Sequence, residues 1–301
     1  MNERKRAHLP AVLPVPAIVG AIVSVQGGAA LAKGLFPALG ATGTVGLRVG
    51  ISAVILLAAF RPRLRGASAA HWRVLVPYGL VLGVMNVVFY LALARIPLGL
   101  AVTVEFIGPL GVAVFGSRRA ADVAWVVLAA AGIALIAPWA GSGADAIGVL
   151  LALTAGACWA AYILIGGRVS RMIPGGAAVA IGMMIATFVA VPVAVATGGF
   201  ARLTPRLFAA GIGVALLSSA IPYTLEMIAL KELPARTFGI LMSLEPAVAA
   251  LAGLVFLHEF LSPRQWLAVV LVIAASTGST LTSRRAEQVA AVVSEEGWQG
   301  G

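Results

Sequence analysis

The chain consists of ten long apolar stretches separated by short polar gaps. Each stretch has roughly the 20 residues that an α-helix needs to cross the hydrocarbon core of a bilayer. Backbone groups in hydrocarbon must find hydrogen-bond partners within the protein, so such stretches fold as helices. The pattern therefore predicts an all-α integral membrane protein with ten transmembrane helices, at residues 12–32, 38–60, 74–94, 97–117, 123–141, 147–167, 175–197, 207–229, 237–257 and 265–283.

The composition excludes an ordinary soluble fold. Hydrophobic residues make up 61% of the 301 residues and charged residues 11%, with a mean hydropathy of +1.03. Soluble domains carry about 25% charged residues. The single cysteine, Cys158, lies in an apolar stretch, which excludes a disulfide framework and a cysteine metal cluster.

The positive charges follow the membrane topology rather than forming a nucleic-acid surface. The net charge is +10, but the basic residues are spread over short gaps between apolar stretches. With the N-terminus inside, fifteen of the 21 Lys and Arg residues fall in cytoplasmic segments and five in outer segments. Because the number of spans is even, we expect both termini in the cytoplasm, with a flexible cytoplasmic tail at 284–301.

The two halves of the chain resemble each other at an offset of 137 residues. Residues 90–97 read YLALARIP and residues 227–234 read MIALKELP, and in both cases a second proline follows twelve residues later, at Pro109 and Pro246. Each half holds five spans, an odd number, so the second half enters the membrane in the opposite sense. Inverted repeats of this kind are a common construction of transporters. The predicted repeats are residues 1–141 and 142–283.

Four residues that would normally be charged lie inside the apolar stretches, namely Arg48, Glu105, Glu226 and Glu245. A charge at the centre of a bilayer costs about 2.5–3.5 kcal/mol on insertion scales. Such residues persist where they face a protein interior or a wet cavity, so they are the first candidates for a transport site.

Several segments in both halves resemble one known family. The chain is similar to the threonine and homoserine exporters of the drug/metabolite transporter superfamily, which contain two EamA-type domains. The resemblance implies two inverted five-helix EamA-type repeats and an exporter of small neutral amino acids in the bacterial inner (plasma) membrane, driven as a proton antiporter with alternating access. The matching stretches are QGGAALAKGLFP (26–37), GVMNVVFYL (83–91), PLGLAVTVEFIGPL (97–110), SRR (117–119), AGACWAAYIL (155–164), PYTLEMIAL (222–230), LPARTFGILMSLEPAVAAL (233–251) and STGSTLT (276–282).

Glu105 and Arg48 are the central candidates of the first half. Glu105 shares a helical face with Ala101 and Gly108, and this small-residue face lets a helix or substrate approach the carboxyl group. Burial favours the neutral carboxyl group, so Glu105 is a candidate proton carrier. Arg48 could hold a substrate carboxylate through two parallel hydrogen bonds, or it could neutralise Glu105 as a structural ion pair.

Polar and aromatic residues on two further spans are candidates to line the site. Asn86 and Tyr90 are four residues apart and face one way; they can bind an amino-acid backbone, join helices, or, for Tyr90, anchor the interface. Trp159 and Tyr162 lie well inside their span, away from the interface where belt aromatics belong, so they wall a cavity or pack in the core.

The eighth and ninth spans contribute the remaining candidates. Ser219, Tyr223 and Glu226 form a stripe at i, i+4 and i+7, beside Pro222. We expect Glu226, close to the cytoplasmic end, to act with Pro222 at a gate or to snorkel to the surface. Glu245, in a Glu-Pro pair that recurs in EamA-type domains, serves the shared architecture or binds a proton or substrate.

Gln26 and Lys33 flank the outer half of the first span. Lys33 reads as a snorkelled end residue or as a site residue.

Other functions remain to be weighed against export of threonine or homoserine. The same fold could export another metabolite, amino acid or drug-like amine. An enzyme is disfavoured because no base–nucleophile pair and no metal-ligand motif lies within the spans, and a channel because no filter segment is visible. We expect no cofactor, no metal and no nucleic-acid partner; the partners are the amino-acid substrate, protons and the lipid bilayer, while monomer or homodimer stays open.

Overall fold

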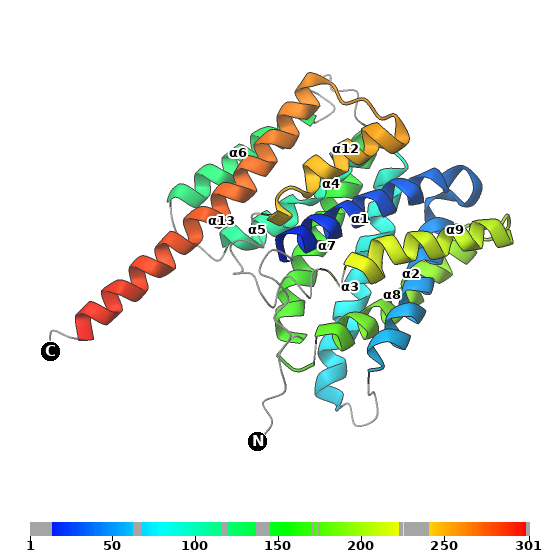
Figure 1. The fold of residues 1–301 in the computed structure, drawn as a ribbon, viewed down its shortest axis with the longest axis horizontal. Coiled ribbons are helices and arrows are strands. Elements are labelled where there is room, and N and C mark those ends of the chain that lie inside the picture. Colours follow the sequence, from blue (N-terminus) through cyan, green and yellow to red (C-terminus); the bar gives the residue numbers. More distant parts are fainter. Residues whose placement is uncertain are drawn as a thin grey trace.

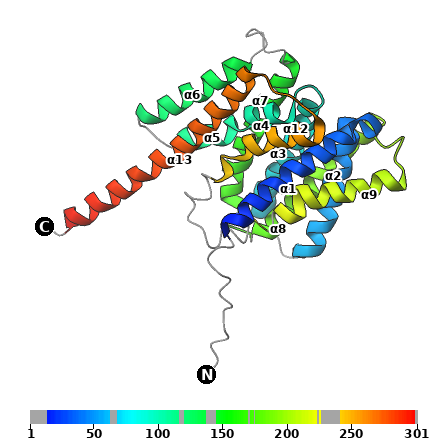
Figure 2. The same cartoon turned by 45° about the horizontal axis from the view of Figure 1, so that its top comes forward.

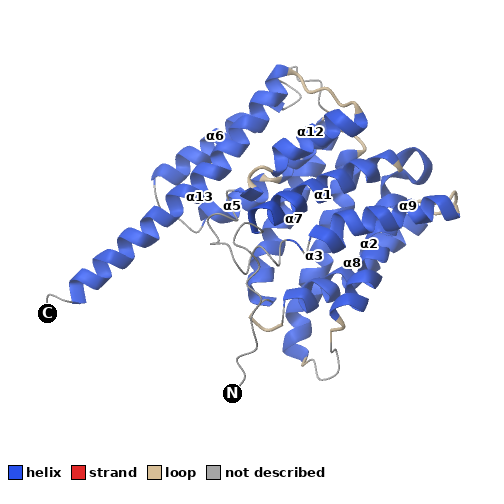
Figure 3. Ribbon diagram, viewed as in Figure 1, coloured by secondary structure: helices blue, strands red, loops and turns tan. Residues whose placement is uncertain are grey.

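The computed structural model describes residues 14–62, 68–115, 120–136, 145–169, 171–173, 175–222, 225 and 241–298. All regular elements in these residues are helices, which confirms the predicted all-α class for this part of the chain (Figure 3). The helices are α1 (Pro14–Gly34), α2 (Phe36–Phe60), α3 (Ala69–Leu93), α4 (Leu98–Glu105), α5 (Ile107–Phe115), α6 (Ala120–Ile136), α7 (Ala146–Val169), α8 (Gly175–Ala196), α9 (Pro205–Ala215), the π-helix η2 (Leu216–Ala220), α12 (Glu245–Leu257) and α13 (Pro263–Trp298).

Five of these helices are long and apolar enough to cross a membrane: α1, α2, α3, α7 and α8. Their ends agree with the predicted spans to within a few residues; α8, for example, covers Gly175–Ala196 where we predicted 175–197. The apolar segments Leu98–Val112, Pro205–Ala220 and Glu245–Leu257 are shorter. The arrangement in ten spans therefore stays a proposal.

The predicted fourth span is broken into α4 and α5 by a turn at Phe106. The break falls directly after Glu105 and before Gly108 and Pro109. Pro109 has no N–H to donate to the carbonyl four residues earlier, that of Glu105, so the helical ladder fails just after that residue. A second turn, at Ser243–Leu244, precedes α12 and its Pro246 in the same way.

A π-helix interrupts the predicted eighth span. In η2 the N–H of Ile221 bonds to the carbonyl of Leu216, five residues earlier. The next residue, Pro222, has no N–H for the carbonyl of Leu217. That carbonyl instead accepts a hydrogen bond of 2.7 Å from the hydroxyl group of Ser24 on α1. The π-helix is therefore joined to α1.

Small residues allow the central helices to approach closely. Along α3, a Cβ added at Gly79 would lie 2.5 Å from the Cβ of Ile185, and one at Gly83 would lie 3.0 Å from the Cα of Ala186, both on α8. Membrane helices pack through such positions because lipid tails offer no hydrophobic driving force for their association. In this way α3 packs against α7 and α8, α2 against α8, and α4 against α12.

Helices α6 and α13 lie side by side at one edge of the molecule, and α13 extends beyond the other helices towards the C-terminus (Figures 1 and 2). Residues 284–298 belong to this helix, whereas we expected a flexible tail from residue 284. The segment contains Ala, Arg, Gln and Glu, which favour helix, and it has no glycine or proline before Gly297. Local propensity therefore continues the helix past the predicted end of the span at residue 283.

Candidate functional site

A cavity of about 430 Å³ lies at the centre of the helices, within the range of about 300–1,000 Å³ that is typical of small-molecule sites. Its walls come from α1, α2, α3, α4, α5, α7, α8, η2 and α12. Eight of the ten residues proposed from the sequence line it; the other two, Tyr223 and Glu226, lie outside the described residues. The eight are Arg48, Asn86, Tyr90, Glu105, Trp159, Tyr162, Pro222 and Glu245.

The guanidinium group of Arg48 is held by two residues of α3. It donates a hydrogen bond to the side-chain oxygen of Asn86 and lies 5.1 Å from the centre of the Tyr90 ring. The amide nitrogen of Asn86 donates to the carbonyl of Leu82 at 2.7 Å, which sets the orientation of its side chain. The Nε atom of Arg48 is buried without a hydrogen-bond partner. Arg48 therefore presents a positioned, partly unused donor to the cavity.

From the sequence, Arg48 could bind either a substrate carboxylate or the carboxyl group of Glu105. No ion pair found among the described residues includes Arg48 or Glu105. Arg48 is bound to a neutral amide instead, so no carboxylate of the described residues matches its charge by direct contact. A buried guanidinium group with an unused N–H is able to take up a ligand carboxylate.

Two carboxyl groups share this cavity with the one guanidinium group. Glu105 ends α4 and Glu245 begins α12, and both side chains are 7% exposed. The charges of Arg48 and Glu245 both act on the carboxyl group of Glu105. The helices α4 and α12 run antiparallel, with Gly99 against Ala250, and this packing brings the two glutamates to the same place.

The two aromatic candidates of α7 are oriented by partners that the sequence did not indicate. The ring of Tyr162 stacks on Tyr78 at 4.8 Å, and the hydroxyl of Tyr78 donates to that of Tyr162 at 2.8 Å. Trp159 meets Phe106 edge to face at 5.6 Å. Phe106 is the turn residue between α4 and α5, a place that apolar periodicity cannot distinguish from continuous helix.

The π-helix changes which serine faces the cavity. We expected Ser219 in a stripe with Tyr223 and Glu226, but Ser219 is buried against α2, where it accepts a hydrogen bond of 2.9 Å from Ser52. Ser218 lines the cavity in its place, four residues before Pro222. Sequence reasoning missed Ser218 because it assumed α-helical periodicity, which a π-turn breaks. Gln26 of α1, considered as a flanking residue, also lines the cavity.

A polar cluster joins the last turn of α1 to two other segments. The ammonium group of Lys33 lies 2.6 Å from a carboxylate oxygen of Glu259 and donates to the carbonyl of Ile96 at 2.8 Å. The other carboxylate oxygen of Glu259 accepts from the N–H of Leu98 at 2.7 Å. Lys33 is therefore paired with Glu259, which sequence reasoning did not single out. The cluster ties α1 to the turn before α4 and to the segment after α12.

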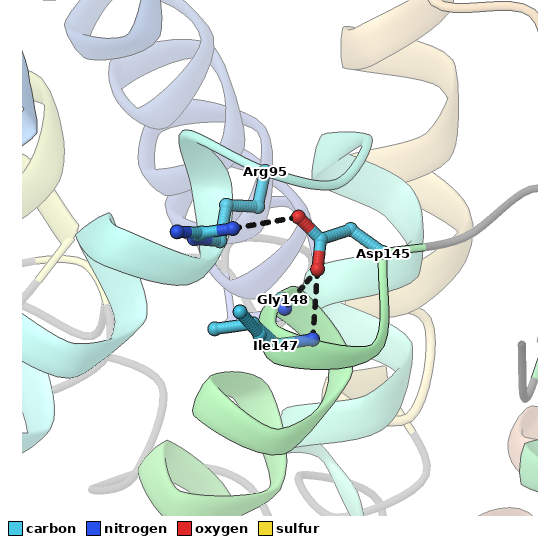
Figure 4. A network of polar contacts seen from close by, with 4 residues as sticks. All are labelled: Arg95, Asp145, Ile147 and Gly148. Atoms are coloured by element: carbon cyan, nitrogen blue, oxygen red, sulfur yellow. Dashed lines mark hydrogen bonds and ion pairs between the residues drawn. The ribbon is translucent and has the colours of Figure 1, made fainter.

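A second ion pair lies on the surface at the start of α7, as Figure 4 shows. Arg95 bonds to one oxygen of Asp145 at 2.8 Å, and the other oxygen accepts from the N–H groups of Ile147 and Gly148. The hydrogen bond from Arg95 is the main cause that lowers the pKa of the Asp145 carboxyl group, with the two backbone N–H groups adding to it. Asp145 thus caps α7 and joins it to the turn after α3.

The chain is similar to known transporters. Residues 146–281 match the EamA-like transporter family. Threonine/homoserine exporter RhtA of Escherichia coli strain K12 is 49% identical over 284 residues, covering 93% of this chain and 96% of its own. The protein of the same name from Salmonella typhimurium strain LT2 is also 49% identical with the same coverage. An uncharacterized transporter of Bacillus subtilis strain 168, YwfM, is 33% identical over 129 residues, 43% of this chain and 44% of its own.

A chain of known crystal structure has the same fold, with a TM-score of 0.60 at 21% identity; the match covers 90% of this chain and 99% of that one. At this identity the likeness shows the fold alone. The relatives of 49% identity cover nearly the whole length of both chains, and their family agrees with the resemblance seen in the sequence. This protein therefore belongs to the EamA-like transporter family, in the group of the threonine/homoserine exporters.

Proposed function

We propose that this protein exports small neutral amino acids of the threonine and homoserine type across the bacterial inner membrane. The names of the relatives that are 49% identical support this substrate class. The observation that carries the proposal is the combination in one buried cavity of a guanidinium group, held by Asn86, with the carboxyl groups of Glu105 and Glu245. A zwitterionic amino acid has the complementary charges: its carboxylate faces Arg48 and its ammonium group faces the glutamates.

The charges of the same cavity support a mechanism of proton antiport. Among the described residues that line the cavity, two carboxyl groups accompany one guanidinium group, and a buried excess of charge is costly. One proton on Glu105 or Glu245 balances the empty cavity, and a bound ammonium group can take the place of that proton. Substrate and proton then occupy the site in alternation, which is the requirement for exchange.

Alternating access is supported by the way the two halves pack. On the predicted repeats, α2 corresponds to α8 and α6 to α13, and each of these pairs is in contact. The contact of α3 with α7 has its counterpart in that of α1 with α9. This pattern is expected if an approximate two-fold axis relates two inverted bundles of five spans, which rock about the central site. We place both termini in the cytoplasm from the distribution of Lys and Arg.

The test is substrate-dependent proton flux in proteoliposomes that contain the full chain. We expect a pH gradient to drive uptake of labelled threonine and homoserine by the wild type. Glu105→Gln should lose the pH-driven component while retaining exchange of labelled for unlabelled threonine. Glu259→Gln, which removes a carboxylate outside the cavity, should keep the pH-driven component. Undiminished coupled flux in Glu105→Gln would remove Glu105 as the proton carrier.

The substrate class is tested separately. If expression of the protein confers no resistance to excess threonine or homoserine, and vesicles show no pH-driven uptake of either, the assignment of these amino acids is wrong. Uptake of another amino acid or a drug-like amine in the same vesicles would then identify a different exporter on the same fold.

A further inference from the structure

Among the described residues, four that line the central cavity each carry a buried polar atom without a hydrogen-bond partner: Gln26 Oε1, Arg48 Nε, Tyr90 OH and Ser218 Oγ. The great majority of buried polar atoms in proteins have a partner, so a group of unpartnered atoms around one cavity points to a ligand that supplies the missing bonds. Arg48 and Tyr90 are in contact with each other, and they form the end of the cavity that we assign to the carboxylate. The other two residues, Gln26 on α1 and Ser218 on η2, have no part in that end of the cavity.

These two residues lie where α1 packs against the π-helix η2. Ser24 binds the carbonyl of Leu217 and thereby holds η2 on α1. A Cβ added at Gly28 would lie 2.5 Å from the hydroxyl oxygen of Ser218, so only glycine at that position allows this approach. The hydroxyl of Ser218 therefore lies against α1 at Gly28, two residues from Gln26, which is only 3% exposed and lines the same cavity.

The chemistry of the pair matches a hydroxyl group. The carboxamide oxygen of Gln26 accepts a hydrogen bond, and the hydroxyl of Ser218 donates one. A ligand hydroxyl both donates and accepts, so it satisfies the two atoms together. An apolar side chain satisfies neither, and it would keep both atoms buried and unpartnered.

We propose that Gln26 and Ser218 form a subsite that binds the side-chain hydroxyl of the transported amino acid. This inference rests on the proposed function, and it names the residues that select the substrate within it. The preferred ligand is a 2-amino acid with a hydroxyl group on its β or γ carbon. Valine, in which a methyl group replaces the hydroxyl of threonine, fits the same space but leaves the subsite unsatisfied. We expect discrimination between the two of at least about 10²-fold, because sites built to bind a hydroxyl strongly reject analogues that lack it.

The experiment is competition for uptake of labelled threonine by the full chain in proteoliposomes, with unlabelled threonine and valine as competitors. The variants are Gln26→Met, which keeps the side-chain length, and Ser218→Ala. Each should reduce the ratio of the two half-inhibitory concentrations to about tenfold or less, by weakening threonine and not valine. Ser219→Ala is the matched control: it is the next residue of η2, buried against Ser52 and outside the cavity. It should keep the wild-type ratio.

Thermal unfolding in detergent separates this subsite from a structural role. Removing an unpartnered polar atom costs no internal hydrogen bond, so Gln26→Met should unfold at or above the wild-type temperature. For a variant that transports poorly, the shifts of the unfolding temperature on adding threonine or valine measure its relative affinity for the two amino acids. The subsite alone is overturned if both variants keep the wild-type ratio of affinities for threonine and valine. It is also overturned if they lose affinity for the two amino acids equally. Absence of threonine uptake and of any threonine-induced shift in the wild type overturns the proposed function as well.

Discussion

Arg48 on α2 donates a hydrogen bond to the side-chain oxygen of Asn86 on α3. The amide nitrogen of Asn86 also donates to the carbonyl of Leu82, so hydrogen bonds at both the oxygen and the nitrogen fix the orientation of this side chain. The neighbouring Tyr90 ring lies against the guanidinium group at 5.1 Å. Arg48 is thus positioned by α3 in a cavity that also holds Glu105 and Glu245, and it does not need a carboxylate partner to stay in place.

Asn86→Ala should weaken the binding of substrate more than its translocation. Without the amide oxygen, the guanidinium group loses its fixed orientation towards the cavity. Because hydrogen bonds to charged groups contribute about 1.5–3 kcal/mol, we expect KM for threonine to rise by at least about tenfold, with a smaller change in maximal rate. Initial rates of uptake in proteoliposomes measure both constants. Thr187→Val is the control, since Thr187 bonds to its own helix and does not line the cavity. An unchanged KM in Asn86→Ala would contradict the role of Asn86.

Lys33 and Glu259 should show a favourable coupling energy. Their side chains are 18% and 15% exposed, between the surface pairs that contribute little and the buried pairs whose breaking is severe. We therefore expect a coupling of about 1–2 kcal/mol from a double-mutant cycle of Lys33→Met, Glu259→Gln and the double variant. The measurement is thermal unfolding of the purified proteins. Strictly additive effects would show that the pair does not tie the three segments together.

Gly108→Ala should be strongly destabilising. An added Cβ would collide with the backbone carbonyl of Gly156, where α5 crosses α7, and backbone atoms cannot rotate away. We expect a loss of at least about 2 kcal/mol in the free energy of unfolding. Gly111→Ala is a matched control on the same helix, because its Cβ would meet no atom within 4 Å. If both variants unfold at the same temperature as the wild type, α5 and α7 are not in this close contact.

The contribution of the Asp145 cap to the stability of the protein should decrease at acidic pH. Its pKa is lowered, chiefly by the hydrogen bond from Arg95, from the usual value of about 3.9 for aspartate. A lowered pKa in the folded state contributes stability that is fully present above the unfolded value and is lost as pH falls through the folded value. The difference in unfolding temperature between wild type and Asp145→Asn should therefore be largest near neutral pH and shrink below about pH 4. A constant difference across this range would contradict the linkage.

The course of the helices could be predicted from local properties of the chain. Apolar length alone located α7 and α8 to within a few residues, because a segment in hydrocarbon must satisfy its own backbone. Burial cost singled out Arg48, Glu105 and Glu245 without any knowledge of the fold, and the three line one cavity. The form of the breaks at Phe106 and in η2 could not be predicted, because a proline several residues later does not specify where or how the helix opens.

Partners distant in sequence could not be predicted. Glu259 meets Lys33 across more than 200 residues, and Tyr78 orients Tyr162 from another helix. Ser218 lines the cavity instead of Ser219 because the π-turn rotates the two serines relative to an α-helix. Each of these contacts depends on how one helix is rotated against another, which apolar periodicity does not specify when helices are apolar on all sides.

The sequence by itself determined that this chain forms apolar helices with a few buried ionisable residues, because the cost of placing polar groups in hydrocarbon acts on each segment separately. Only the tertiary structure decided that Arg48 binds Asn86 and not Glu105, and that Gln26 and Ser218 line the same cavity. Those relationships arise from close packing between helices, where a single glycine or proline sets which side chains face each other.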